Sequence, residues 1–113
     1  MSQLIVYKLD NLINKDKLKQ KCLLLNIDLI VIDDMFLKIK IKDILNKKGR
    51  KAKNKNLDYP LVLFSNVPSK TLDDLIACLK GDVCLKAIVT ATNYNWTFVY
   101  LYEHILEEYQ KNR

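Results

Sequence analysis

Three aspartates are the side chains with the clearest capacity to share a chemical site. Asp10 follows the apolar run at 4–9, and Asp33 and Asp34 follow the run at 27–32. Carboxylates that meet beyond neighbouring strands can bind Mg²⁺ or Mn²⁺. The ordinary role of aspartate at such positions is to cap helices and form turns, and we expect that role here. A small enzyme with a metal site at these aspartates is therefore the weakest of three hypotheses.

The cysteines and the single histidine do not form a recognisable reactive or metal-binding motif. The chain has neither a C-x-x-C pair nor an H-x-x-x-H pair among Cys22, Cys78, Cys84 and His104. This spacing argues against a zinc site. The two glycines do not lie in a strand-to-helix turn, so a phosphate-binding loop is not expected. We expect reduced thiols in the core, no metal and no cofactor. We therefore favour a protein that is not an enzyme.

The segment from Lys86 to Thr97 carries the most distinctive polar pattern in the chain. In one interpretation, Thr90 and Asn93 end a strand, Asn95 caps the last helix and Trp96 closes the core. In the other, Lys86, Thr90, Asn93 and Trp96 converge on a small anion or an acidic partner. Both alternatives stay open from the sequence.

The spacing in this segment is K-A-x-x-T-x-x-N-x-x-W-T. It resembles the C-terminal signature of a family of short, uncharacterised proteins from Firmicutes and related bacteria, a domain of unknown function. The matching residues are Lys86, Ala87, Thr90, Asn93, Trp96 and Thr97. The similarity extends loosely back to Leu61 and more weakly to the N-terminal part. Because that family has no assigned activity, the resemblance supports the predicted fold and implies no function.

Positive charge is concentrated in one segment. Residues 38–55 contain nine basic residues and one acidic residue, a local net charge of +8, whereas the whole chain carries +6. The candidate contacts to nucleic acid are Lys47, Lys48, Arg50, Lys51, Lys53 and Lys55. A solvated lysine-rich loop is the ordinary interpretation, and contact with RNA or DNA is the alternative. One arginine and the lack of an aromatic residue before Tyr59 argue against base stacking in this segment.

Apolar periodicity predicts the elements that would position these residues. We expect strands at 4–9, 27–32, 61–64 and 83–89. We expect helices at 15–25, 69–80 and 96–110. Residues 36–42 alternate like a strand, but Leu37, Ile41, Ile44 and Leu45 also fit a helix capped by Asp34, which we prefer. Residues 46–59 read as a loop or a disordered segment.

The alternation β-α-β-α-β-α-β-α predicts a single α/β domain over residues 1–113. We expect three layers, with a mainly parallel four-stranded sheet and helices on its faces. Ligands of open α/β sheets bind beyond the carboxyl ends of the strands, which adds Asp33 and Asn66 to the candidate binding residues. The chain has neither a signal-peptide pattern nor an apolar run of the roughly 20 residues that a membrane span needs, so we expect a cytoplasmic protein without membrane partners.

The resulting functional hypothesis is a non-catalytic binding or interaction module that uses the strand-end face near Thr90–Trp96. Its partner would be an unknown protein or a small polar ligand. The alternative is a weak nucleic-acid-associated protein that acts through Lys38–Lys55. A homodimer stays open, because the sheet has two edges and the last helix is rich in tyrosine.

Overall fold

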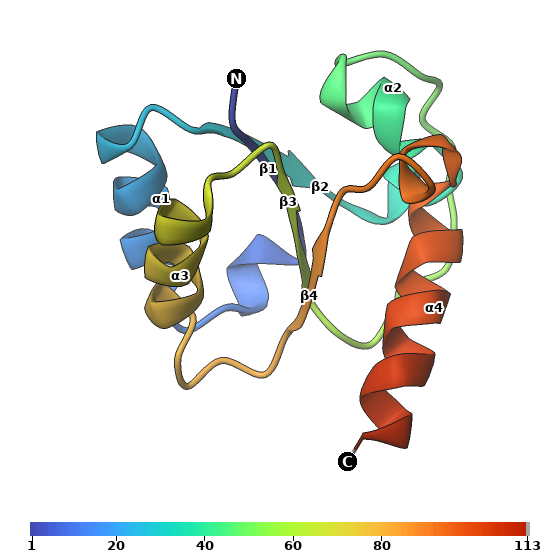
Figure 1. The fold of residues 1–113 in the computed structure, drawn as a ribbon. Helices are drawn as coiled ribbons and strands as arrows, with labels where there is room; N and C mark the ends of the chain where they lie inside the picture. The colour runs from blue at the N-terminus through green and yellow to red at the C-terminus, as the bar shows by residue number, and fades with distance from the viewer. Residues whose placement is uncertain (113) are drawn as a thin grey trace.

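The computed structural model describes residues 1–112, which form an α/β fold around a four-stranded open sheet (Figure 1). The strands are β1 (Gln3–Tyr7), β2 (Asp28–Ile32), β3 (Leu61–Ser65) and β4 (Leu85–Ile88). The α-helices are α1 (Lys15–Leu24), α2 (Ile41–Leu45), α3 (Ser69–Cys78) and α4 (Phe98–Lys111). Short 3-10 helices are η1 (Leu9–Asn11), η2 (Asp34–Phe36) and η3 (Asn93–Asn95). The expected alternation of strands and helices around a mainly parallel sheet is confirmed.

The sheet contains two parallel pairs joined by one antiparallel pair. Its strand order is β2-β1-β3-β4. β1 is parallel to β2 and β3 is parallel to β4, but β1 and β3 are antiparallel, with Gln3 opposite Ser65 and Tyr7 opposite Leu61. The carboxyl ends of β1 and β2 therefore lie at one end of the sheet, and those of β3 and β4 lie at the other. β2 and β4 are the edge strands.

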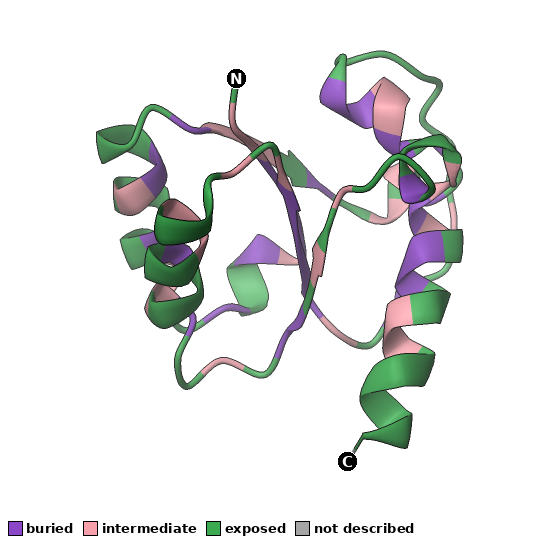
Figure 2. Cartoon of the chain, in the orientation of Figure 1, coloured by how far each residue is buried: buried purple, intermediate pink, exposed green. Residues whose placement is uncertain are grey.

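Helices cover both faces of the sheet, with α1 and α3 on one side and α4 on the other (Figure 1). Successive strand side chains point to opposite faces, so β1 contributes to two cores. Leu4 and Val6 pack in the core on the side of α1 and α3. Ile5 and Tyr7 pack in the core formed with α2 and α4. Figure 2 shows the buried residues concentrated in the sheet and on the inner sides of the helices.

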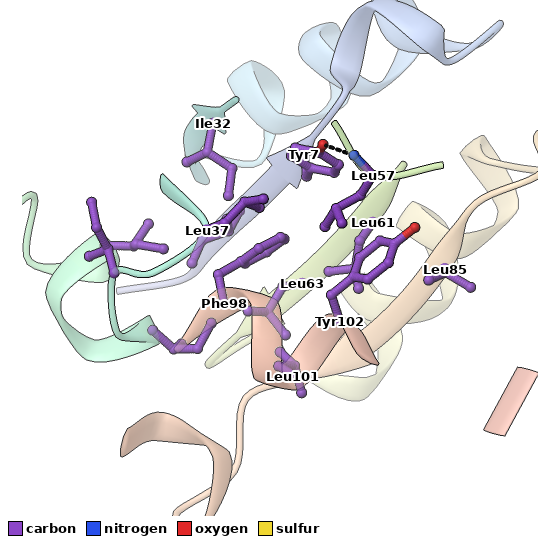
Figure 3. Close-up of a cluster of buried hydrophobic side chains, with 14 of the residues drawn as sticks. Tyr7, Ile32, Leu37, Leu57, Leu61, Leu63, Leu85, Phe98, Leu101 and Tyr102 are labelled. Carbon is purple, nitrogen blue, oxygen red and sulfur yellow. Dashed lines mark hydrogen bonds between the residues drawn. The ribbon is translucent and has the colours of Figure 1, made fainter. Parts of the chain in front are cut away.

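Aromatic side chains fill the core beneath α4. The Tyr7 ring lies 5.7 Å from that of Phe98 and 6.2 Å from that of Tyr102, measured between centroids (Figure 3). All three side chains are almost fully buried. This core joins the first strand of the chain to its last helix.

The predicted helix from Asp34 to Leu45 is wrong over most of its length. Only Ile41–Leu45 is α-helical, and η2 precedes it. Between them, the backbone binds the start of α4: the N–H of Phe98 donates to the C=O of Ile39 (2.9 Å) and that of Val99 to Leu37 (2.8 Å). Because these carbonyls are used in tertiary contacts, residues 37–40 form neither an α-helix nor a strand, although their side chains alternate between buried and exposed.

Two further local predictions need correction. α4 begins after Thr97, whose side chain accepts the N–H of Tyr100 (3.3 Å), and not after Asn95, which lies in η3. Of the three free cysteines, Cys22 and Cys84 are buried, but Cys78 is only half-buried. Burial raises the pKa of the Cys22 thiol to about 11, with a smaller contribution from Cys78.

Candidate functional site

The polar residues that follow the strands lie at two opposite ends of the sheet. Asp33 follows β2, whereas Asn66 follows β3 and Thr90 lies just beyond β4. Since β1 and β3 are antiparallel, Asp33 is separated from Asn66 and Thr90 by the length of the sheet. The structure therefore does not bring the predicted strand-end residues together at one face.

Asn93 closes a turn with its own neighbours. Its side-chain oxygen accepts the N–H of Thr90 (2.8 Å), and its side-chain nitrogen donates to the C=O of Ile88 (3.0 Å). The N–H of Asn93 in turn donates to the Thr90 hydroxyl (3.1 Å). Asn93 is only 7 % exposed. These bonds give the pair a structural role and leave little hydrogen-bonding capacity for a ligand.

Lys86 and Trp96 lie on different faces of the molecule. Lys86 is opposite Val62 in the β3–β4 ladder, and Val62 belongs to the core on the α1 and α3 side. The Trp96 ring lies instead on the side of α4, 4.8 Å from the rings of both Tyr100 and His104. Lys86, Thr90, Asn93 and Trp96 thus do not converge on one site.

Asn66 connects the end of β3 to the start of the chain. It adopts a left-handed backbone conformation with φ of 55°. Its backbone C=O accepts the Ser2 hydroxyl (2.8 Å), and its side-chain nitrogen donates to the C=O of Met1 (3.4 Å). These contacts favour a turn that fixes the N-terminal strand.

The acidic end of the sheet is organised around Tyr7. Its hydroxyl donates to the Asp34 carboxylate and accepts the N–H of Leu57 (2.9 Å; Figure 3). Burial raises the pKa of Tyr7, and the hydrogen bond to Asp34 raises it further. Asp33 caps η2 by accepting the N–H of Met35 (2.9 Å). Within residues 1–112, no group of three or more His, Cys, Asp or Glu side chains could hold a metal ion.

A concave surface lies at the outer edge of β2, where the lysine-rich loop packs beside the sheet. We call this surface the β2 groove; its volume is about 390 Å³. Three consecutive residues of the edge strand, three apolar side chains and the loop line it. These residues are Leu29, Ile30, Val31, Phe36, Ile39, Ile44, Lys47, Lys48, Gly49 and Lys51.

The walls and the rim of the β2 groove differ in chemistry. Ile39 and Ile44 belong to the main core, and Phe36 packs against it, so the wall is apolar and fixed. The rim lysines Lys47, Lys48 and Lys51 are exposed. The groove therefore combines a rigid apolar wall with a positively charged rim.

Specific contacts hold the loop over the groove. Gly49 has φ of +106°, and a Cβ atom at this position would lie 2.6 Å from Cγ2 of Ile39. Lys47 pairs with the Asp28 carboxylate at 3.1 Å, and the Lys51 ammonium lies 4.9 Å from the centroid of the Phe36 ring. Glycine is needed here because a side chain would meet both an unfavourable backbone conformation and a buried neighbour.

The remaining candidates on the loop do not line the groove. Arg50, Lys53 and Lys55 are exposed on the same segment. Residues 46–60 contain neither helix nor strand, yet the segment is anchored: the Ala52 N–H donates to the C=O of Met35 (3.0 Å), and Leu57 is buried. These lysines stand out in the sequence, whereas the apolar wall does not. An isolated glycine within the lysine-rich run was the available signal.

Comparison with known proteins gives a family match for the second half of the chain. Residues 60–111, which run from the start of β3 into α4, match the family described as Domain of unknown function (DUF3783). Neither the curated proteins nor the solved structures contain a match to the chain. In the part of the chain that the structure describes, the helices are too short or too polar to cross a membrane.

Proposed function

We propose that this protein is a non-catalytic binding module that holds an anionic, partly apolar ligand in the β2 groove. The observation that carries this proposal is the position of three lysines beside an apolar wall, at a sheet edge with which no strand in residues 1–112 pairs. Small-ligand sites are typically apolar concavities with a few charged groups that orient the ligand. The β2 groove has this composition.

The charge on the rim favours a negatively charged ligand. Lys47 is partly neutralised by Asp28. Lys48 and Lys51 form no ion pair with other residues in the range 1–112. An anionic group placed at this rim would gain from two uncompensated ammonium groups, while an attached apolar chain would cover Phe36 and its neighbours.

The earlier hypothesis of binding at Thr90–Trp96 receives less support. The side chain of Asn93 is buried and hydrogen-bonded within its own turn, and Lys86 lies on another face from Trp96. We also propose a bacterial protein with a cytoplasmic location. We further propose that the K-A-x-x-T-x-x-N-x-x-W-T pattern is a signature of its family.

Association with nucleic acid is the second candidate function, and one observation favours it. Lys40 forms an isolated antiparallel β-bridge with Thr97. The basic segment therefore runs beside the aromatic cluster of Trp96, Tyr100 and His104. Tyr100 is 48 % exposed. Exposed aromatic rings beside lysines are typical of surfaces that bind single-stranded nucleic acid. Glu103, Glu107 and Glu108 farther along α4 oppose a polyanion.

The proposed function is tested by titrating ¹⁵N-labelled protein with sodium laurate below its micelle concentration. Laurate joins a carboxylate to an apolar chain. We expect amide shifts concentrated in β2, Phe36 and Lys47–Lys51. The combined change Lys48→Glu with Lys51→Glu should weaken binding at least about tenfold, because it reverses the rim charge.

The matched control carries the same charge change at the two ends of the α3 region, as Lys70→Glu within α3 with Lys80→Glu in the turn after it. Both lysines are exposed and lie outside the groove. This control should retain laurate binding. Shifts located elsewhere, or equal weakening in both double variants, would refute binding in the β2 groove. A salt-sensitive titration with single-stranded RNA that shifts Tyr100 and Trp96 instead would favour the alternative.

A further inference from the structure

We propose that the natural occupant of the β2 groove is an extended acidic polypeptide that pairs with β2 as a fifth strand. This inference rests on the proposed function and adds the class of partner and the binding mode. It follows from an unpaired strand edge, an apolar wall and a lysine rim that meet in one groove.

The orientation of the β2 backbone leaves hydrogen-bonding groups directed into the groove. The N–H of Asp28 donates to the C=O of Ser2 (3.1 Å), on the side of β1. Since backbone groups of alternate residues in a strand point to opposite sides, those of Leu29 and Val31 point away from β1. Both residues line the groove. Among residues 1–112, no partner strand covers this edge.

After its first residue, Asp28, β2 contains no charged residue or proline of the kind that protects an edge strand. Its sequence, Asp-Leu-Ile-Val-Ile, contains neither lysine nor proline, and Val31 is 52 % exposed. Exposed edges are ordinarily blunted by charge, proline or a bulge. The other edge strand, β4, carries the exposed Lys86. An apolar, unprotected edge is the surface to which an extended peptide adds a strand.

The positive charge beside the β2 groove favours an acidic peptide over a second copy of this chain or a nucleic acid. A second copy of this chain would bring two basic segments together, each with a local net charge of +8 over residues 38–55. An acidic peptide would instead place carboxylates beside Lys48 and Lys51. A nucleic acid would gain little from the groove itself, because, of the described residues that line it, Phe36 alone has an aromatic ring on which a base could stack.

The experiment selects peptides from a library of random decapeptides displayed on phage. We expect the selected sequences to carry acidic residues and apolar residues at alternate positions, because neighbouring side chains of an added strand point to opposite faces. Each selected peptide is then synthesised and titrated against the wild-type chain, the Lys48→Glu/Lys51→Glu variant and the Lys70→Glu/Lys80→Glu control. Only the groove variant should lose affinity.

Strand addition differs from other binding modes because it needs hydrogen bonds from the peptide backbone, and these can be removed one register at a time. N-methylation of alternate peptide amides should weaken binding at least about tenfold in the register that removes the pairing donors, and leave it unchanged in the other register. The bound peptide should slow hydrogen exchange of the Leu29 and Val31 amides. The change Val31→Pro should also abolish binding, since it removes a groove-facing N–H that β1 does not use. If that variant does not fold, the methylated peptides carry the test on the wild-type chain.

The outcomes distinguish the two proposals. Selected peptides that tolerate both methylation registers and leave the Leu29 and Val31 amides unprotected would overturn strand addition, while laurate binding in the groove would still stand. Failure of the library to yield any binder sensitive to Lys48→Glu/Lys51→Glu would also overturn the inference. Loss of laurate binding in the groove would instead remove the proposed function on which the inference rests.

Discussion

At the scale of single residues, Asn93 joins the end of β4 to the turn that precedes α4. Asn93→Ala would leave the N–H of Thr90 and the C=O of Ile88 without their side-chain partner. We expect a loss of about 1–3 kcal/mol in the free energy of unfolding, because both partners lose a hydrogen bond at a partly buried site. Urea unfolding followed by circular dichroism measures this change.

The neighbouring Asn95→Ala provides the control for Asn93. Asn95 is exposed and lies in the same 3-10 helix. Its replacement should change stability by less than about 0.5 kcal/mol, as is usual for surface positions. Equal effects of the two changes would contradict the structural role of Asn93 and restore interest in ligand binding at this turn.

At the scale of elements, the position of the lysine-rich loop depends on the close contact between Gly49 and Ile39. Gly49→Ala places a methyl group against the buried Ile39 side chain, at a backbone conformation that also disfavours alanine. Gly81→Ala meets a similar conformation, with φ of +96°, but has nothing within 4 Å. The two changes therefore share the backbone strain and differ in the steric contact.

We expect Gly49→Ala to lower the free energy of unfolding by about 1–3 kcal/mol more than Gly81→Ala does, because overpacking adds to the strain. Thermal unfolding of both variants measures the difference. Gly49→Ala should also weaken laurate binding, since Gly49 lines the β2 groove. Equal stability of the two variants would show that the loop moves away from Ile39 at little cost.

At the scale of the whole molecule, the two halves of the chain share one sheet and the core on each of its faces. The family match begins at Pro60 and so contains β3 and β4 but neither β1 nor β2. β3 pairs with β1 along its whole length, and Tyr7 packs between Phe98 and Tyr102. The matched segment therefore lacks a central strand and part of its own core.

A fragment of residues 60–113 should accordingly fail to unfold cooperatively, because removal of β1 exposes the apolar faces of β3 and α4. Amide spectra in the random-coil range and a flat thermal transition are the expected results. Addition of a fragment of residues 1–59 should restore dispersed signals. A cooperative transition in the isolated 60–113 fragment would show that the matched segment folds independently.

Most strands and helices, and the concentration of positive charge at 38–55, could be predicted from the sequence, whereas the helix expected after Asp34 could not. Continuous apolar runs such as Leu4–Tyr7 and helical spacing such as Leu101 to Ile105 reflect local geometry, so most strand–helix units could be predicted. The turn signals in Thr90–Thr97 were visible too, and they favoured a structural turn but also allowed a binding site. The hydrogen bonds of Asn93 add the structural evidence for the turn.

The tertiary structure alone decided the direction of the second half and the location of the groove. The loop between α2 and β3 has no periodic pattern, so nothing local specifies that β3 runs antiparallel to β1. That reversal sends Asp33 and Thr90 to opposite ends of the sheet. The β2 groove likewise depends on contacts between residues distant in sequence, such as Lys47 with Asp28 and Phe98 with Ile39. Such contacts depend on the packing of the complete core, which no short stretch of the chain encodes.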